Sequence, residues 1–220
     1  DENEELIIVC DNINFKFKNA KIIKSNKKIY ANGTRNLGYK SSNAEYLIFL
    51  DSDIYVDKDF MKKIRGEINN NDIDILNFPI KGEVSNNFFS IYKGLREEFD
   101  TNYKSENIFF GFACLFKTKV FKELGGWPEK SKFDFIMEHE GFQKIILKSK
   151  FKNQISNKIS VNHHHHKNLN IFYNVCYRSY IWVIKKIKKQ VEFDNLKSIK
   201  SAIISFLGFN ILFSLFFDIK

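Results

Sequence analysis

The chain has 220 residues, of which 44% are hydrophobic, and its formal net charge is +9. This length allows one sizeable domain with a smaller appendage, and this apolar content excludes wholesale disorder. The positive charge predicts an anionic partner, which could be a nucleotide, a phospholipid surface or nucleic acid. Lysines are spread along the whole chain, so charge alone does not choose among these partners.

The three cysteines, Cys10, Cys114 and Cys176, are far apart and form no C-x-x-C pair. Their odd number and wide spacing argue against a disulfide framework and a zinc knuckle, and they favour a reducing compartment. The chain begins with DENEEL, without Met or a signal peptide, and its first apolar run follows almost at once. We therefore expect this chain to be cut from a longer one.

Apolar runs alternate with helical patterns in the first part of the chain. The runs that predict strands are LIIVC (6–10), KIIK (21–24), EYLIFL (45–50) and DILNFPI (74–80). Residues 33–42 and 57–68 predict helices, and Asp57 is the expected cap of the second. Strands that alternate with helices predict an α/β domain with a mainly parallel central sheet flanked by helices.

The same alternation continues towards four consecutive histidines. Residues 110–118 predict a strand, and residues 119–124 predict a short helix that stops at Gly125-Gly126. Residues 159–162 predict a last strand, directly before the histidines. Between these lies a predicted helix over 140–150, with the inward-facing residues Phe142, Ile145, Ile146 and Leu147.

The last third of the chain differs in composition. Residues 171–190 are aromatic and basic, and residues 202–217 form a nearly unbroken apolar run. This run is slightly shorter than the roughly 20 residues of a membrane helix, so a buried core helix is the alternative. We predict a folded domain over 1–168 and a helical, membrane-associated tail over 169–220. Lysines before the apolar run would bind anionic headgroups and place the domain at the cytoplasmic face of the cell membrane.

Carboxylates follow two of the predicted strands. Asp11 comes after the first run, and Asp51 and Asp53 come after residues 45–50. Ligands of an open parallel sheet bind beyond the carboxyl ends of its strands, so we expect these acids along one edge. Residues i and i+2 of an extended segment point the same way, so both acids of the pair could address one hard cation, Mg²⁺ or Mn²⁺. A solvated turn or a helix cap is the alternative for this pair.

The segment TRNLGYKSSNAEYLIFLDSD resembles the central signature of the family 2 glycosyltransferases, which have the nucleotide-sugar-binding A-type fold. In that family an Arg-Asn-x-Gly helix precedes a strand that ends in Asp-x-Asp. The later segments FGFACLFKTKVFKELGGWPE, EHEGFQKIILKSKFK and VNHHHHKNL resemble the blocks that follow in the family, in the same order. The matching positions are Arg35, Asn36, Gly38, Asp51, Asp53, Gly125, Gly126 and Trp127. The family's first strand and helix have no counterpart here, so we expect the domain to be incomplete at its N-terminus.

The resemblance implies a role for each acid. Asp53 would hold Mn²⁺ or Mg²⁺ at the diphosphate of the donor, with Asp51 beside it as a ribose contact or second metal position. Asp11 would accept a hydrogen bond from the nucleotide base, or it is only a turn residue after a strand. The family's Glu-Asp position reads Glu138-His139 here. We favour Glu138 as the catalytic base, with His139 and Glu140 as the alternatives.

Several matching residues have a structural alternative. Arg35 would hold the diphosphate or brace the Asp pair, and its alternative is a surface salt bridge. His163 aligns with the family's own His and is a candidate third metal ligand, or it is part of an exposed polar loop. Gly125 and Gly126 belong to the donor site or only stop a helix. Trp127 stacks on the acceptor or packs in the core.

These features predict a metal-dependent, inverting glycosyltransferase. Its donor would be a nucleotide-diphosphate sugar, and its acceptor a glycan or a lipid-linked molecule at an anionic membrane surface; we expect no nucleic-acid partner. One alternative is a nucleotidyltransferase on a related fold, which would need a Gly-rich phosphate loop that the sequence lacks. The other alternative is an inactive fragment or a membrane-bound binding module.

Overall fold

The fold was analysed in a computed structural model, which describes residues 4–11, 17–25, 29–81, 91, 94–95, 98–99, 101, 109–129, 138–163 and 207. The chain divides into two units, Asp1–His165 and His166–Lys220, and the elements named below belong to the first. The predicted tail over 169–220 lies outside the described residues, apart from Leu207, and so does the predicted boundary at 168. Among the described residues, no helix is both long enough and apolar enough to cross a membrane.

The N-terminal part is a two-stranded sheet with one helix against it. Strands β1 (Ile7–Asp11) and β2 (Lys21–Ser25) pair in parallel, with Ile7 opposite Lys21. Helix α1 (Ala31–Lys40) follows and packs on β1. The contact is close, because a Cβ at Gly38 would lie 3.4 Å from Val9 Cγ2. Three predicted elements are therefore confirmed here, with the helix starting two residues earlier than expected.

The central sheet has the strand order β3-β7-β5-β8. Its strands are β3 (Tyr46–Leu50), β5 (Ile75–Asn77), β7 (Ala113–Lys117) and β8 (Asn153–Ile155). Strand β7 runs antiparallel to both β3 and β5, and only β5 and β8 pair in parallel. The prediction of a mainly parallel sheet is therefore wrong. An apolar run as fully buried as Ala113–Phe116 marks a central strand but carries no information on its direction.

A second, smaller sheet has the strand order β4-β9-β6. Each of its strands comes directly after a strand of the central sheet along the chain. Strand β9 (Val161–His163) lies in its middle, antiparallel to β4 (Ile54–Tyr55) and parallel to β6 (Ile80–Lys81). The register sets Ile54 opposite His163. The residue before Ile54 is Asp53, so this pairing brings the second aspartate close to the first of the four histidines.

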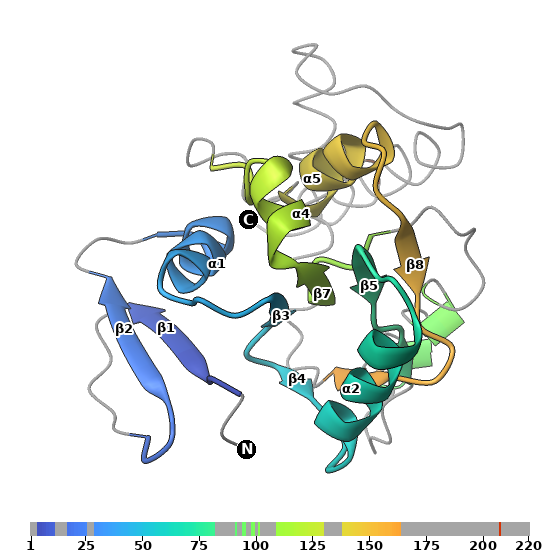
Figure 1. The fold of residues 1–220 in the computed structure, drawn as a ribbon, viewed down its shortest axis with the longest axis horizontal. Coiled ribbons are helices and arrows are strands. Elements are labelled where there is room, and N and C mark those ends of the chain that lie inside the picture. Colours follow the sequence, from blue (N-terminus) through green and yellow to red (C-terminus); the bar gives the residue numbers. More distant parts are fainter. Residues whose placement is uncertain are drawn as a thin grey trace, which may run out of the picture. The chain divides into compact units, whose positions relative to one another are not determined.

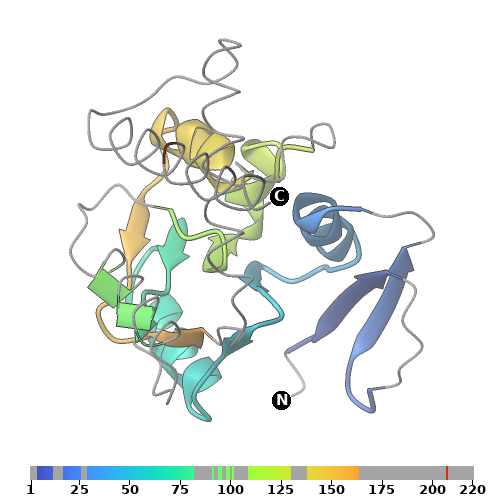
Figure 2. The same cartoon turned by 180° about the vertical axis from the view of Figure 1, so that it is seen from behind.

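Helices cover both faces of the central sheet. Helix α2 (Phe60–Asn70) packs on the face formed by Leu76, Ala113 and Leu115. Helices α4 (Thr118–Glu123) and α5 (Glu138–Leu147) pack on the face formed by Phe49, Cys114 and Phe116. Figures 1 and 2 show α4 and α5 on the other side of the sheet from α2. The alternation of these strand residues between the two clusters follows from the period of two of a β-strand.

Two details of the helices differ from the sequence prediction. Helix α2 begins at Phe60 and has Asp59 at its N-cap, whereas Asp57 only accepts the Phe60 N–H through its backbone carbonyl. In α5, Phe142 and Ile146 are buried, but Ile145 and Leu147 are 39% and 47% exposed. The inward stripe of α5 is narrow, since it carries the i and i+4 positions and leaves the neighbouring positions to solvent.

Candidate functional site

The candidate site begins where strand β3 ends. The backbone turns sharply after Leu50, and the Ile54 N–H donates to the Asp51 carbonyl at 3.1 Å. The Asp51 N–H donates in turn to the Phe112 carbonyl at 2.9 Å. This turn separates β3 from β4, so Asp51 and Asp53 lie at the junction of the two sheets.

Arg35 of α1 holds the first aspartate. Its Nη2 donates to Asp51 Oδ1 at 2.5 Å, and its side chain is only 8% exposed. Its Nη1 donates to Asn32 Oδ1 at 3.2 Å, and its guanidinium carbon lies 4.5 Å from the centre of the Trp127 ring. The contact with the indole ring holds the guanidinium in place, and its planar fork suits an ion pair with a carboxylate. Arg35 thus contacts the first acid of the pair, and its predicted role at the diphosphate stays a prediction.

Asn36, the next residue of α1, fastens this helix to the segment after α4. Its Nδ2 donates to the Trp127 carbonyl at 2.8 Å and to Glu129 Oε1 at 2.6 Å. Its Oδ1 accepts the Trp127 N–H at 2.9 Å. A buried amide that meets both backbone groups of one residue leaves little freedom between the two segments. Trp127 itself is 1% exposed, which favours the packing role over the predicted contact with an acceptor.

Gly125 and Gly126 end helix α4 in left-handed backbone conformations, with φ of 83° and 75°. The Gly126 N–H donates to the Phe121 carbonyl at 3.1 Å, which caps the end of the helix. The predicted helix stop is thus confirmed. The two glycines differ in their surroundings, because a Cβ at Gly126 would lie 2.9 Å from Asn36 Oδ1 and a Cβ at Gly125 would meet nothing within 4 Å.

Asp53 and His163 form the second half of the site. Asp53 Oδ2 lies 3.2 Å from His163 Nε2, and the two side chains are 39% and 15% exposed. A carboxylate oxygen and an imidazole nitrogen that approach this closely are a donor pair suited to Mn²⁺. Within the described ranges, no cluster of three or more His, Cys, Asp or Glu side chains could hold a metal ion. The carboxylate and imidazole donors of Asp53 and His163 fit a divalent ion, and these are the two residues that would hold it.

Burial raises the pKa of Asp51 above the usual range of an aspartate, and this effect outweighs the opposing effect of Arg35. The folded chain therefore keeps the Asp51 proton to a higher pH than the unfolded chain does. Because the unfolded chain then binds fewer protons, the contribution of Asp51 to stability falls as the pH rises above about 4 towards the raised pKa.

We therefore expect the wild-type chain to lose stability relative to Asp51→Asn as the pH increases through this window, because the amide does not titrate. Urea unfolding of both chains at several pH values in metal-free buffer measures the difference. A difference that grows in favour of the wild type with rising pH would contradict the raised pKa.

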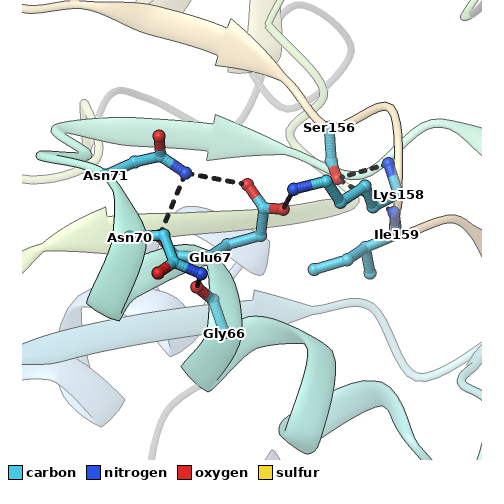
Figure 3. Close-up of polar contacts among 7 residues, drawn as sticks. All are labelled: Gly66, Glu67, Asn70, Asn71, Ser156, Lys158 and Ile159. Carbon is cyan, nitrogen blue, oxygen red and sulfur yellow. Dashed lines mark hydrogen bonds and ion pairs between the residues drawn. The ribbon is translucent and has the colours of Figure 1, made fainter.

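Contacts with α2 support the strand that carries His163. Lys158, in the loop before β9, forms an ion pair of 2.8 Å with Glu67 of α2, and Asn71 donates to Glu67 at 3.3 Å (Figure 3). Ser156 Oγ accepts the N–H groups of Lys158 and Ile159. A surface hollow of about 270 Å³ opens beside this loop, lined by residues such as Pro79, Lys81 and Lys158. None of its lining residues belongs to the Asp51, Asp53 and His163 group.

Four of the predicted site residues are placed only by their backbone. Asp11 is the last residue of β1, opposite Ser25, and its side chain is outside the described part of the chain. Glu138, His139 and Glu140 form the first turn of α5, and their side chains are likewise outside it. The assignment of the base and of the nucleotide-base contact stays a prediction.

Two residues with structural roles were not predicted: Asn77 supports the central sheet, and Phe112 contacts the candidate site. Asn77 is fully buried in β5; its Nδ2 donates to Asn153 Oδ1 and the Gln154 carbonyl, and its Oδ1 accepts the Phe110 N–H. An amide inside the apolar run DILNFPI was the available signal, because a buried polar group needs partners. Phe112 lies between Asp51 and His163, and nothing distinguishes it in sequence from the other phenylalanines.

The fold and this site define a protein of the glycosyltransferase A-type class. The chain belongs to glycosyl transferase family 2, whose sequence profile matches residues 3–125. This family is one of glycosyltransferases, as the resemblance of the motifs predicted. No curated protein matches the chain.

Solved structures show the same fold at low sequence identity. The mannosyltransferase PcManGT from Pyrobaculum calidifontis, in complex with GDP-Man and Mn²⁺, is 12% identical with a TM-score of 0.54, over 85% of this chain and 51% of that one. TarS 1-349 of S. aureus in complex with UDP is 15% identical with a TM-score of 0.55, over 82% and 56%. GalNAc-T7 with UDP, GalNAc and Mn²⁺ is 12% identical with a TM-score of 0.55, over 90% and 47%. The chain thus spans about half the length of these structures.

Proposed function

We propose that this chain transfers a sugar from a nucleotide-diphosphate sugar to a glycan or lipid-linked acceptor, with inversion and with the help of Mn²⁺ or Mg²⁺. The observation that carries the proposal is the approach of Asp53 Oδ2 to His163 Nε2 at the end of β3, beside an Asp51 held by Arg35. PcManGT and GalNAc-T7 were solved with Mn²⁺ and nucleotides or nucleotide sugars, which supports a metal and a donor of this kind.

Asp53 and His163 are the residues that would hold the ion. A divalent ion supplies positive charge next to the diphosphate leaving group of a sugar nucleotide. We assign Asp51 a different role, because Arg35 Nη2 already donates to its Oδ1 at 2.5 Å. Its fixed carboxylate is left as a contact for the nucleotide, and Asp11 is the proposed contact for the base.

The acceptor hydroxyl needs a base on the opposite face of the sugar. Helix α5 starts at Glu138, and we assign this role to Glu138, with His139 and Glu140 as alternatives. A carboxylate there would take the proton of the hydroxyl as the oxygen attacks the anomeric carbon, which inverts its configuration.

The direct test is donor hydrolysis by this chain. With Mn²⁺ present, we expect release of nucleoside diphosphate from at least one member of a panel of UDP and GDP sugars. Removal of the metal with EDTA should abolish the release, and added Mn²⁺ or Mg²⁺ should restore it. Binding of donors without any turnover would favour the binding module instead, and release that EDTA does not affect would contradict metal dependence.

We also propose that residues 169–220 hold the domain at the cytoplasmic face of the cell membrane. The support is the sequence alone, in which lysines precede the apolar run 202–217. Carbonate extraction of membranes from expressing cells tests it: the chain should stay in the pellet, and its release into the supernatant would contradict an inserted segment.

A further inference from the structure

Asp53 and His163 are the proposed metal ligands and are called the metal pair below. A third residue, Phe112, contacts this pair through His163. Its ring lies 6.0 Å from the His163 ring, centroid to centroid, with 15° between the planes. It also stacks on Phe110, at 5.5 Å and 13°. Phe112 is partly buried and packs against the core cluster of α2, β5 and β9, so its own position is fixed by the fold. This is an offset, nearly parallel contact within the range of ring separations that stabilise aromatic pairs, so it favours one orientation of the imidazole plane.

The backbone of the same residue contacts the other half of the site. The Phe112 carbonyl accepts the Asp51 N–H at 2.9 Å, at the start of the turn that carries Asp53. The Phe112 side chain therefore orients His163 while its main chain anchors the aspartate turn. Strand register alone does not do this, because the pairing of Ile54 with His163 sets the backbone of β9 but leaves the torsion angles of the imidazole open.

We propose that Phe112 is a positioning residue for the metal pair, which acts by stacking on His163 and keeping Nε2 directed at Asp53. This inference rests on the proposed function, because it requires Asp53 and His163 to bind a divalent ion. The groups around a metal-bound histidine that fix its orientation typically change metal affinity by about 10- to 100-fold when they are lost. Phe112 would supply that orientation through ring stacking.

The test measures the affinity for Mn²⁺ alone, by the electron paramagnetic resonance signal of the free ion, without donor or activity. Mn²⁺ is chosen because it binds isolated imidazoles weakly, so the histidines after His163 contribute little. Phe112→Leu is expected to weaken Mn²⁺ binding about 10-fold, because an aliphatic side chain fills the space but cannot stack. Phe112→Tyr keeps the ring and is expected to bind Mn²⁺ about as tightly as the wild type.

A double-mutant cycle separates this role from a general loss of structure. If Phe112 acts through His163, Phe112→Leu should cause little further loss in a His163→Ala chain. An equal loss of affinity in both backgrounds, or no loss in Phe112→Leu, would overturn the inference and leave the metal pair intact. No Mn²⁺ binding by the wild type, or no weakening by His163→Ala, would overturn the pair and the inference together. Circular dichroism checks that each variant is folded, and Phe112→Met replaces Phe112→Leu if the latter is not.

Discussion

Asp53→Asn is expected to lower metal-dependent donor turnover by about 100-fold or more, since loss of a ligand should exceed the effect of losing an outer-shell contact. The amide keeps the size of the side chain but removes the negative charge that an oxygen ligand supplies. Asp53 is 39% exposed and lies in a turn, so the substitution should leave the fold unchanged. Initial rates of nucleoside diphosphate release across a Mn²⁺ titration measure the effect.

Asp72→Asn is the matched control for this prediction. The Asp72 side chain is 89% exposed, and its Oδ1 lies 3.4 Å from Lys117 Nζ. Loss of so exposed a charge should change neither turnover nor stability. Wild-type turnover in Asp53→Asn would rule out Asp53 as the metal ligand. If Asp51→Asn lost as much of its Mn²⁺ affinity as Asp53→Asn, the division of roles between the two acids would be wrong.

Gly126→Ala is expected to lower the free energy of unfolding by about 3 kcal/mol, whereas Gly125→Ala should cost only about 1–2 kcal/mol. Both residues have positive φ, and an L-residue pays for that conformation at either position. Only at Gly126 would the new Cβ also lie 2.9 Å from Asn36 Oδ1. The amide would then have to leave the Trp127 N–H and carbonyl, two buried groups that depend on it.

Urea unfolding of the two alanine variants measures the difference between the neighbouring glycines. A second comparison in an Asn36→Ala background isolates the contact, because the clash partner is then absent. There we expect Gly126→Ala to cost no more than Gly125→Ala does in the wild type. Equal losses for the two glycines in the wild-type chain would show that backbone conformation alone requires Gly126.

The strands and helices of the domain were predictable because each is encoded by a local pattern. The runs at 6–10, 45–50 and 74–80 are long enough in apolar residues to mark β1, β3 and β5. Gly125 and Gly126 end α4 for a reason that is local too, since only glycine adopts positive φ readily. Strand direction was not predictable, since buried strands of either direction have the same apolar run.

The site divides in the same way. Asp51 and Asp53 were predicted as site residues from their place after an apolar strand, and His163 from the resemblance to the family. The contacts behind the proposed division of their roles come from packing: Arg35 lies 16 residues before Asp51 and pairs with it, while β9 brings His163 to Asp53 from 110 positions further along the chain. Trp127 moved from a possible acceptor contact to the core for the same reason.

By itself, the sequence determined the positions of most elements, it indicated the family through the resemblance of its ordered motifs, and it predicted candidate side chains for a metal and a donor. Those properties depend on composition and on spacing along the chain. The tertiary structure decided that Arg35 pairs with Asp51 and His163 with Asp53, that Asn36 fastens α1 to Trp127, and that the Phe112 and His163 rings lie nearly parallel. These are distances between residues far apart in the chain, and no periodicity of the sequence encodes them.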